Sequence, residues 1–147
     1  MEKAEIIEFA NQHPVSWVAT VEGDKPHVRG MMMWFADDTG FYYHTGTMKS
    51  LPHQLEKNPN VEIAFYDPGT GPQDGKMMRV AGVAEIVEDE GLKKRLLEER
   101  PWVGEIHKQF PDSKGVIFKV NHAQAYIWTM AMNGREGDLE RVTIGAE

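Results

Sequence analysis

The sequence predicts a mainly β protein, in which an antiparallel sheet closes into a small barrel and is flanked by helices. Two observations favour this fold class. About six or seven short segments are rich in β-branched and aromatic residues, or alternate apolar with polar residues, as strands do. Most successive strands are separated by tight turns, such as residues 22–26 and 37–40, which suit antiparallel pairing. A parallel sheet would need a longer crossover between its strands.

The expected elements follow from local periodicity. Ile6, Phe9 and Ala10 recur at helical spacing, and Pro14 ends that pattern. Gly82 lies inside the longest strand and predicts a bulge or bend. The expected strands cover residues 15–21, 27–36, 41–44, 61–66, 76–87, 115–120 and 123–130. The expected helices cover residues 3–12 and 90–100, with a short helix carried by Leu51 and Leu55 and another containing Val103, Ile106 and Phe110.

The chain of 147 residues has the length of one domain. We expect residues 1–132 to form that domain and residues 133–147 to form a polar tail, which only Leu139, Val142 and Ile144 can anchor. The glycine- and proline-rich segment 67–75 matches neither a dinucleotide fingerprint nor a Walker loop. We therefore interpret it as a hairpin excursion between two strands.

Composition excludes several kinds of function. The net charge of −7 argues against a nucleic-acid surface, which needs clustered Lys and Arg. With no cysteine, the chain has no disulfide, thiolate nucleophile or Cys-based metal site. The charged N-terminus lacks an apolar signal core, and no apolar run reaches membrane-spanning length, so a cytoplasmic protein is expected. The six histidines show no metal-ligand spacing, and we expect no metal site.

A turn that follows the strand at 41–44 has the composition of a phosphate site. Thr45, Thr47 and Ser50 supply hydroxyl groups, Lys49 supplies a charge, and Gly46 lets the backbone approach a ligand closely. The helix that follows offers unpaired N–H groups at its N-terminus. The alternative is an ordinary strand–turn–helix corner with Thr47 or Ser50 as N-cap.

The expected strand 27–36, which precedes the strand 41–44, carries Arg29 in an otherwise apolar run, followed by Met31, Met32 and Met33. Consecutive methionines form a polarizable surface that suits an aromatic ring. The alternative is a Met-rich core strand with Arg29 at its solvated end. If Arg29 converges with Lys49, a phosphate at one end and a flat heterocycle at the other describe FMN.

The same residues resemble a known family. Arg29-x-x-x-x-Trp34, Phe41-Tyr42-Tyr43-x-Thr45, Lys49 and Gln54-Leu55-x-x-Asn58-Pro59-x-Val61 are similar to the FMN-binding split-barrel family related to pyridoxamine 5′-phosphate oxidase. The resemblance spans about residues 4–130 and implies a six-stranded antiparallel split barrel. It also implies a homodimer, with two FMN sites at the subunit interface.

The resemblance assigns roles to individual residues. Arg29 and Lys49 resemble the basic phosphate ligands, and Thr45, Thr47 and Ser50 fall where phosphate-contacting hydroxyls are found. The backbone of residues 31–33 is expected at the isoalloxazine edge. Trp128 resembles a late aromatic residue that reaches FMN from the partner subunit; the alternative is a core or interface tryptophan.

Two departures limit the assignment. Met48 and the longer spacing between Lys49 and Gln54 leave the individual phosphate ligands open. The Arg-x-His pair that holds substrate in the oxidase is absent from residues 130–136, so vitamin B6 oxidation is not supported.

The sequence therefore predicts a homodimeric FMN-dependent oxidoreductase that acts on an unidentified small molecule, with a nicotinamide as a candidate electron donor. No side chain is assigned as a general acid or base. One alternative is a non-catalytic flavin-binding redox or sensor module. Another is a split barrel that binds haem or a deazaflavin, with His44, His107 or His122 as a candidate axial ligand.

Overall fold

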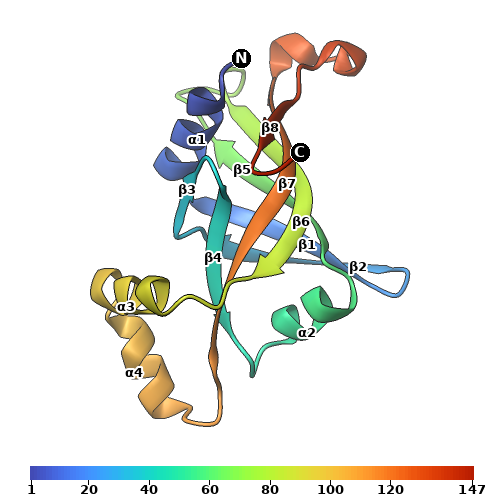
Figure 1. Ribbon diagram of the computed structural model, residues 1–147. Helices are drawn as coiled ribbons and strands as arrows, with labels where there is room; N and C mark the ends of the chain where they lie inside the picture. Colours follow the sequence, from blue (N-terminus) through green and yellow to red (C-terminus); the bar gives the residue numbers. More distant parts are fainter.

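One antiparallel sheet organises the protein, and a computed structural model describes all of residues 1–147 (Figure 1). Its strands are β1 (Val15–Glu22), β2 (Lys25–Met32), β3 (Phe35–Asp37), β4 (Gly40–Gly46), β5 (Asn60–Asp67), β6 (Lys76–Ile86), β7 (Gly115–Thr129) and β8 (Val142–Ile144). Its helices are α1 (Lys3–Gln12), α2 (Ser50–Lys57), α3 (Glu90–Glu99) and α4 (Trp102–Gln109), with two 3-10 turns at Met130–Met132 and Glu136–Asp138. The fold is a mainly β split barrel with flanking helices, as the sequence predicts. β3 and β8 are short additions to six principal strands.

The strand order explains why the sheet curls. The hydrogen-bonded path runs β2-β1-β5-β6-β7-β4-β3, with β8 attached to β7. β2 and β3 stand at opposite ends of that path, yet only Met33 and Trp34 separate them in the chain. Two residues span about 7 Å at most, so the two ends of the sheet must meet. The barrel therefore closes on itself, and it does so without a ladder between β2 and β4.

The barrel interior holds the main core. Side chains that alternate along the strands point inward and are fully buried, as the period of two requires. The Tyr43 hydroxyl lies inside this core and bonds the Ser16 hydroxyl at 2.7 Å, and burial raises the pKa of Tyr43. Ile6, Phe9 and Ala10 of α1 close one end of the core, which confirms the face predicted for that helix. The strand members of this core include Val18, Phe41, Ile63, Phe65, Met78, Val80 and Phe118.

A second, smaller core joins α3 and α4 to the outside of the barrel. Leu96 of α3 and Val103 of α4 pack on Trp34, Tyr42 and Ile117. Asp89 caps α3, because its Oδ1 accepts a hydrogen bond from the Leu92 N–H. The helix pair lies beside the ends of β4 and β7, across from α2 (Figure 1). This places α4 over the region where β2 and β4 face each other.

Two predicted strand boundaries are wrong. The expected strand 27–36 is two strands, because β2 pairs with β1 whereas β3 pairs with β4. The expected strands 115–120 and 123–130 are one strand, β7, which continues through His122 at a positive φ of 47°. Val142 and Ile144 anchor the tail, as expected, because both are buried in β8, which pairs with β7. Local periodicity shows which face a residue takes, and not which strand is its partner.

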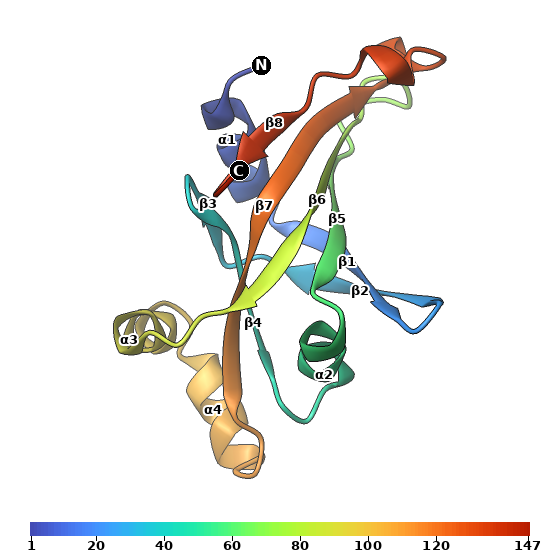
Figure 2. The same cartoon turned by 45° about the vertical axis from the view of Figure 1, so that its right-hand side comes forward.

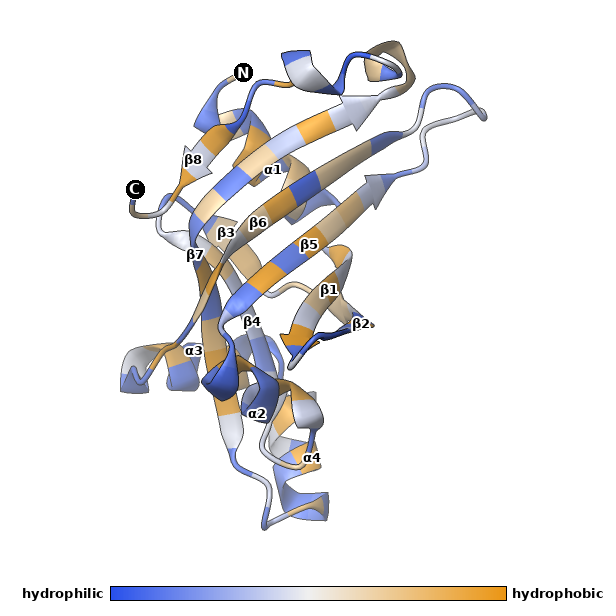
Figure 3. Ribbon diagram, turned by 90° about the vertical axis from the view of Figure 1, so that its right-hand side faces the viewer, coloured by the Kyte–Doolittle hydropathy of each residue, from blue (hydrophilic) through white to orange (hydrophobic).

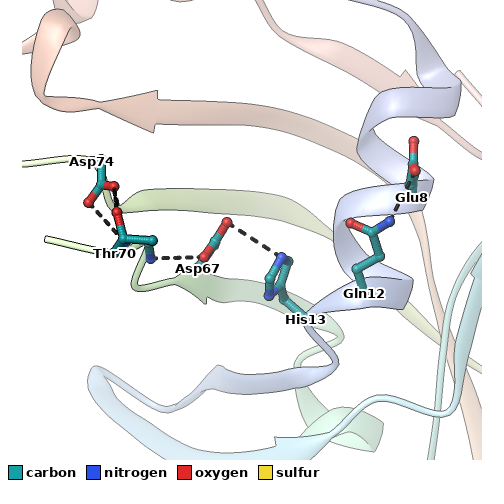
Figure 4. A network of polar contacts seen from close by, with 7 residues as sticks. Glu8, Gln12, His13, Asp67, Thr70 and Asp74 are labelled. Atoms are coloured by element: carbon teal, nitrogen blue, oxygen red, sulfur yellow. Dashed lines mark hydrogen bonds and ion pairs between the residues drawn. The ribbon is translucent and has the colours of Figure 1, made fainter.

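The hairpin loop 67–75 is held by its own side chains, as Figure 4 shows. Asp74 accepts hydrogen bonds from the backbone N–H and hydroxyl of Thr70 and from the Gly71 N–H, and these donors lower the pKa of Asp74 to about 2. Oδ2 of Asp67 lies 3.6 Å from Nε2 of His13, the residue that follows α1. These contacts agree with a hairpin excursion. The loop lies far from the turn at residues 45–50, which has the composition of a phosphate site. No helix of the structure has the length and apolar character needed to span a bilayer.

Gly82 forms the predicted bulge, since the β6–β7 register shifts between Ala81 and Val83. A Cβ at this position would lie 2.8 Å from the Asn121 carbonyl oxygen and 2.7 Å from a Val120 methyl carbon. We expect Gly82→Ala to lower the free energy of unfolding by about 1–3 kcal/mol, because the backbone neighbours cannot yield freely. Urea denaturation followed by far-UV circular dichroism measures this change.

Gly137→Ala is the matched control, because a Cβ there meets nothing within 4 Å. Its stability should stay within about 0.5 kcal/mol of the wild type. Equal stability of the two variants would show that the bulge tolerates a side chain.

Candidate cofactor site

The gap between β2 and β4 opens into two adjoining cavities. β3 pairs only with Gly40–Tyr42, so the later residues of β4 have no strand on that side. β2 likewise pairs only with β1. Residues 30–32 and 44–46 line the cavities, and residues of α4 line one of them. Figure 2 shows α4 beside the lower ends of β4 and β7. One cavity has a volume of about 390 Å³ and reaches α4; the other has a volume of about 420 Å³ and reaches the start of α2.

Arg29 forms one side of the cavity at α2. Its guanidinium donates to the Val18 carbonyl, to the Thr20 hydroxyl at 2.9 Å and to Oε1 of Gln54 at 2.6 Å. All three acceptors are neutral, so the arginine is held firmly but its charge has no counter-ion. Burial lowers the pKa of Arg29, yet an arginine stays protonated in proteins.

The first turn of α2 forms the opposite side. Lys49 is the N-cap and Ser50 the first helical residue, and no side chain caps the helix. Pro52 falls in the first turn and contributes no N–H, as the sequence requires of it. Both Lys49 and Ser50 are exposed at the cavity, and Lys49 makes no ion pair. The helix N-terminus thus presents unpaired N–H groups beside a free ammonium group, a combination suited to an anion.

The lining of both cavities contains three cations, Arg29, Lys49 and Arg100, and no Asp or Glu. This is unusual for a chain whose net charge is −7. A basic pocket without acidic neighbours holds a positive potential that favours a negatively charged ligand.

The cavity under α4 has a large apolar part. Met31 and Met32 lie on one side of it, and two side chains of α4 and the C-cap residue, spaced four residues apart, lie on the other. That spacing puts them on one helix face. They remain partly exposed although they are large and apolar, which marks a surface available to a ligand. The three residues are Trp102, Ile106 and Phe110.

Arg100 and His44 lie at the boundary of this cavity. Arg100 donates to Nε2 of His44 at 2.7 Å, so Nε2 must be the unprotonated nitrogen and Nδ1 carries the proton. Burial lowers the pKa of His44 to about 4, with further contributions from Arg100, Lys49 and His107. At neutral pH His44 is therefore an uncharged hydrogen-bond donor through Nδ1.

Thr45 provides a test of fit. Its hydroxyl is buried and has no hydrogen-bond partner in the structure. Thr45 lines both cavities, at the point where they meet. A buried hydroxyl without a partner costs free energy, and a polar group bound between the two cavities would supply one. The residues present thus suit a ligand with an anionic end, a polar middle and a flat apolar end.

The structure brings together most of the residues predicted from sequence. The cavity at α2 is lined by Arg29, Met31, Thr45, Lys49 and Ser50, and Met32 lines the neighbouring cavity. Whether these residues bind FMN stays a prediction.

Three predicted residues lie elsewhere. The Met33 side chain is in the barrel core, although its carbonyl accepts a bond from Arg100. The Thr47 hydroxyl accepts from the Lys114 N–H and faces the start of β7. Trp128 lies near the far end of β7, away from both cavities of its own protomer. Its predicted role requires a partner subunit.

The residues that the sequence prediction missed come from the α3–α4 junction. Arg100, Trp102 and Phe110 line the apolar cavity, but they follow the phosphate-like turn by about fifty residues. The four-residue spacing of Trp102, Ile106 and Phe110 was the available signal. Of the candidate haem ligands, His44 and His107 line this cavity, whereas His122 lies on β7 beside Glu85.

The lowered pKa of His44 makes a prediction about pH. The unfolded chain binds a proton here near pH 6.5 and the folded chain only near pH 4, so stability is lost as the pH falls through that window. We expect the wild type to lose about 1–2 kcal/mol more than His44→Gln between these pH values, after allowance for partial exposure. Urea denaturation at several pH values measures the difference. Parallel stability curves for the two proteins would contradict the assignment of a neutral imidazole.

Comparison with known proteins agrees with this fold and adds a family. The sequence profile of the pyridoxamine 5′-phosphate oxidase family matches residues 2–129. General stress protein 26 of Bacillus subtilis is 30% identical over 108 residues, which cover 74% of this chain and 72% of that protein.

Solved structures share the architecture. General stress protein 26 from Bacillus anthracis has a TM-score of 0.68 and 26% identity, with 98% of this chain and all of that chain covered. A NimC/NimA family protein from Clostridium acetobutylicum has a TM-score of 0.70 and 21% identity, covering 94% and 90% of the two chains.

Two more distant structures share the fold and bear names that state a ligand. An FAD-binding protein from Mesorhizobium loti has a TM-score of 0.63 at 15% identity, covering 85% of this chain and 94% of that one. HutZ, the heme storage protein of Vibrio cholerae, has a TM-score of 0.62 at 18% identity, covering 86% and 93%. At such identities the likeness concerns the fold alone. The matches to the family profile and to general stress protein 26 show that this chain belongs to the pyridoxamine 5′-phosphate oxidase family.

Proposed function

We propose that this protein is an FMN-binding flavoprotein that acts as an oxidoreductase. The observation that carries the proposal is the charge of the cavity lining: three cations without a carboxylate, in a chain of net charge −7. Split barrels with this fold include a flavin-binding and a haem-binding protein by name. The fold alone therefore does not determine which cofactor binds, and the argument for FMN must come from the residues of the site.

The phosphate of FMN would lie in the cavity at α2. Arg29, Lys49 and the helix N-terminus offer two charges and unpaired N–H groups, and charge-assisted hydrogen bonds are the strong ones. Because Arg29 is fixed by Thr20 and Gln54, it needs little reorganisation to receive an anion. The flat ring would lie against Met31, Met32 and the apolar face of α4.

When bound, FMN supplies the transfer of hydride or single electrons. The chain's own residues supply position and shielding. Trp102, Ile106 and Phe110 cover the cavity and keep water from its apolar end. The Nδ1–H of His44 is a neutral donor that does not compete for protons near pH 7. No residue is assigned as a general acid or base, and the substrate stays open, with a reduced nicotinamide as the candidate donor.

A homodimer is the second part of the proposal, and it rests on exposed aromatic side chains, which share one sheet face with the Glu62–Arg79 ion pair. Trp17 of β1 is 45% exposed and Tyr66 of β5 is 50% exposed. Trp17 pairs with Ala64, two residues before Tyr66, so both side chains are on one face. Tyr66 lies opposite Met77, which lies opposite Trp128, so Trp128 shares that face. Figure 3 shows β5, β6 and β7 side by side, with hydrophilic and hydrophobic residues mixed along them. A second copy docked there would receive Trp128 at its interface.

Two alternatives make different optical predictions. A bound flavin that a reduced nicotinamide does not bleach would favour a sensor or storage module over an enzyme. A Soret band would favour haem, for which His44 and His107 lie suitably in one cavity. FMN is preferred because Nε2 of His44 already accepts a bond from Arg100 and is not free to bind iron. Mass spectrometry of the released cofactor distinguishes FMN from a deazaflavin.

The cofactor assignment is tested by titrating the protein with FMN and following flavin absorbance. We expect Lys49→Ala to weaken binding by about 1.5–3 kcal/mol, or roughly 10- to 150-fold, because a charge-assisted contact is lost. Arg29→Ala should weaken binding as much, and it should also lower thermal stability, because Thr20 and Gln54 lose their partner.

The control is Lys57→Ala, at the other end of α2, which should bind FMN as the wild type does. A protein that takes up no FMN would refute the proposal. Unchanged affinity in both Lys49→Ala and Arg29→Ala would place the phosphate elsewhere.

The dimer is tested by light scattering after size-exclusion chromatography. We expect the wild type at twice the chain mass of 16.7 kDa and Trp17→Glu at the single mass, because the substitution puts a charge into an apolar interface. FMN affinity should fall together with dimerisation, since Trp128 of the partner is then lost from the site. Leu97→Glu, an equally exposed position on α3, is the control and should stay dimeric. A monomeric wild type that binds FMN would contradict the shared site.

A further inference from the structure

Arg100 ties together the two strands that border the cavity. It is the residue after α3, and its guanidinium donates to the Met32 carbonyl at 3.4 Å, to the Met33 carbonyl at 2.9 Å and to Nε2 of His44 at 2.7 Å. Met32 is the last residue of β2, Met33 follows it, and His44 belongs to β4. Pro101 follows and stiffens the backbone at the helix junction. The guanidinium is therefore fixed at the wall of the apolar cavity.

Arg100 makes no ion pair, although the charge of nearby Glu99 acts on it electrostatically. Its sequence neighbour Glu99 bonds Arg95 at 2.6 Å and the Trp34 indole N–H at 3.0 Å, and it makes no ion pair with Arg100. No carboxylate lines the cavity. All three acceptors of Arg100 are neutral. Two are backbone carbonyls, and the third, His44, is uncharged at neutral pH because burial lowers its pKa to about 4. A fixed, half-buried cation thus faces an apolar space, where a charge acts over a longer range than in water.

We propose that Arg100 sets the redox behaviour of the bound flavin, by stabilising the negative charge that the ring gains on reduction. This inference rests on the proposed function and concerns the same cavity. If a reduced nicotinamide gave a hydride to bound FMN, one C–H bond would break, one N–H bond would form on the ring, and two electrons would move with one proton. The nicotinamide would be oxidised, and the ring would gain one net negative charge. Arg100 supplies the balancing positive charge without a second proton.

The other cations of the site are less suited to this role. Arg29 lines only the cavity at α2, which is assigned to the phosphate. Lys49 lines both cavities, but its side chain is exposed and no hydrogen bond fixes its position. His44 is neutral. Arg100 is the charged residue of the apolar cavity whose side chain is held in place by hydrogen bonds. Its interaction should therefore be stronger with the reduced ring than with the oxidised ring, and a difference of this kind changes the reduction potential.

The experiment compares the affinities of oxidised and reduced FMN in wild type, Arg100→Gln, Arg100→Lys and Arg95→Gln. The potential of the bound flavin is measured by slow reduction with dithionite against a reference dye. We expect Arg100→Gln to lower the preference for reduced over oxidised FMN at least tenfold, which is about 30 mV for a two-electron couple. Arg100→Lys keeps the charge and should retain most of the preference.

Arg95→Gln is the matched control. It removes the same charge at a position five residues earlier, in α3. The guanidinium carbon of Arg95 lies 4.3 Å from the centre of the Phe35 ring, and Arg95 does not line the cavity. We expect its potential to equal that of the wild type. Thermal melting of each variant reports separately on the structural link between the strands.

The outcomes distinguish the inference from the proposed function. A wild type that binds no FMN refutes both. Normal binding of oxidised FMN by Arg100→Gln with an unchanged potential refutes only the inference. Equal weakening of both oxidation states, or the same loss in Arg100→Lys as in Arg100→Gln, would show that Arg100 acts as a structural link and not through its charge.

Discussion

The structure depends on one geometric constraint: two residues, Met33 and Trp34, must join strands that lie at opposite ends of the sheet. This short connection forces the sheet to curl, and the Trp34 N–H bonds the Tyr42 carbonyl as the chain passes over to β4. The same constraint leaves β2 and β4 facing each other without a ladder. Unpaired strand edges usually promote aggregation. Here they border a cavity, so an edge that would be a liability becomes the site.

Side-chain hydrogen bonds connect the strands at the gap, where no backbone ladder joins β2 and β4. The hydroxyls of Ser16 and Tyr43 join β1 to β4 inside the core, and Arg100 joins β2 to β4 at the cavity. Arg29 joins β2 to α2 through Gln54. Each of these links sets a polar or charged group against neutral partners. The barrel is therefore held together at the gap by the groups that also give the cavity its charge.

Local sequence signals predicted the fold class, and they predicted that Arg29, Lys49 and Ser50 converge, as they do at the cavity by α2. α1, Pro52 in the first turn of α2 and the Gly82 bulge follow from spacing and backbone chemistry, which act over a few residues. The end of β2 at Met32 and the continuity of β7 through His122 depend on strand partners distant in sequence. Arg100 was missed for the same reason. Its neighbours in the chain are helical, whereas its hydrogen-bond partners are Met32, Met33 and His44.

The cover of the cavity is built as an insertion. α3 and α4 lie between β6 and β7, which pair directly with each other, so the barrel ladder is complete without them. They touch the barrel mainly through a small separate core and the Arg100 link. Natural variation in this segment can therefore change what enters the cavity while the barrel and the phosphate-like corner stay intact. The residues that line this end of the cavity are thus largely separate from those that hold the barrel together.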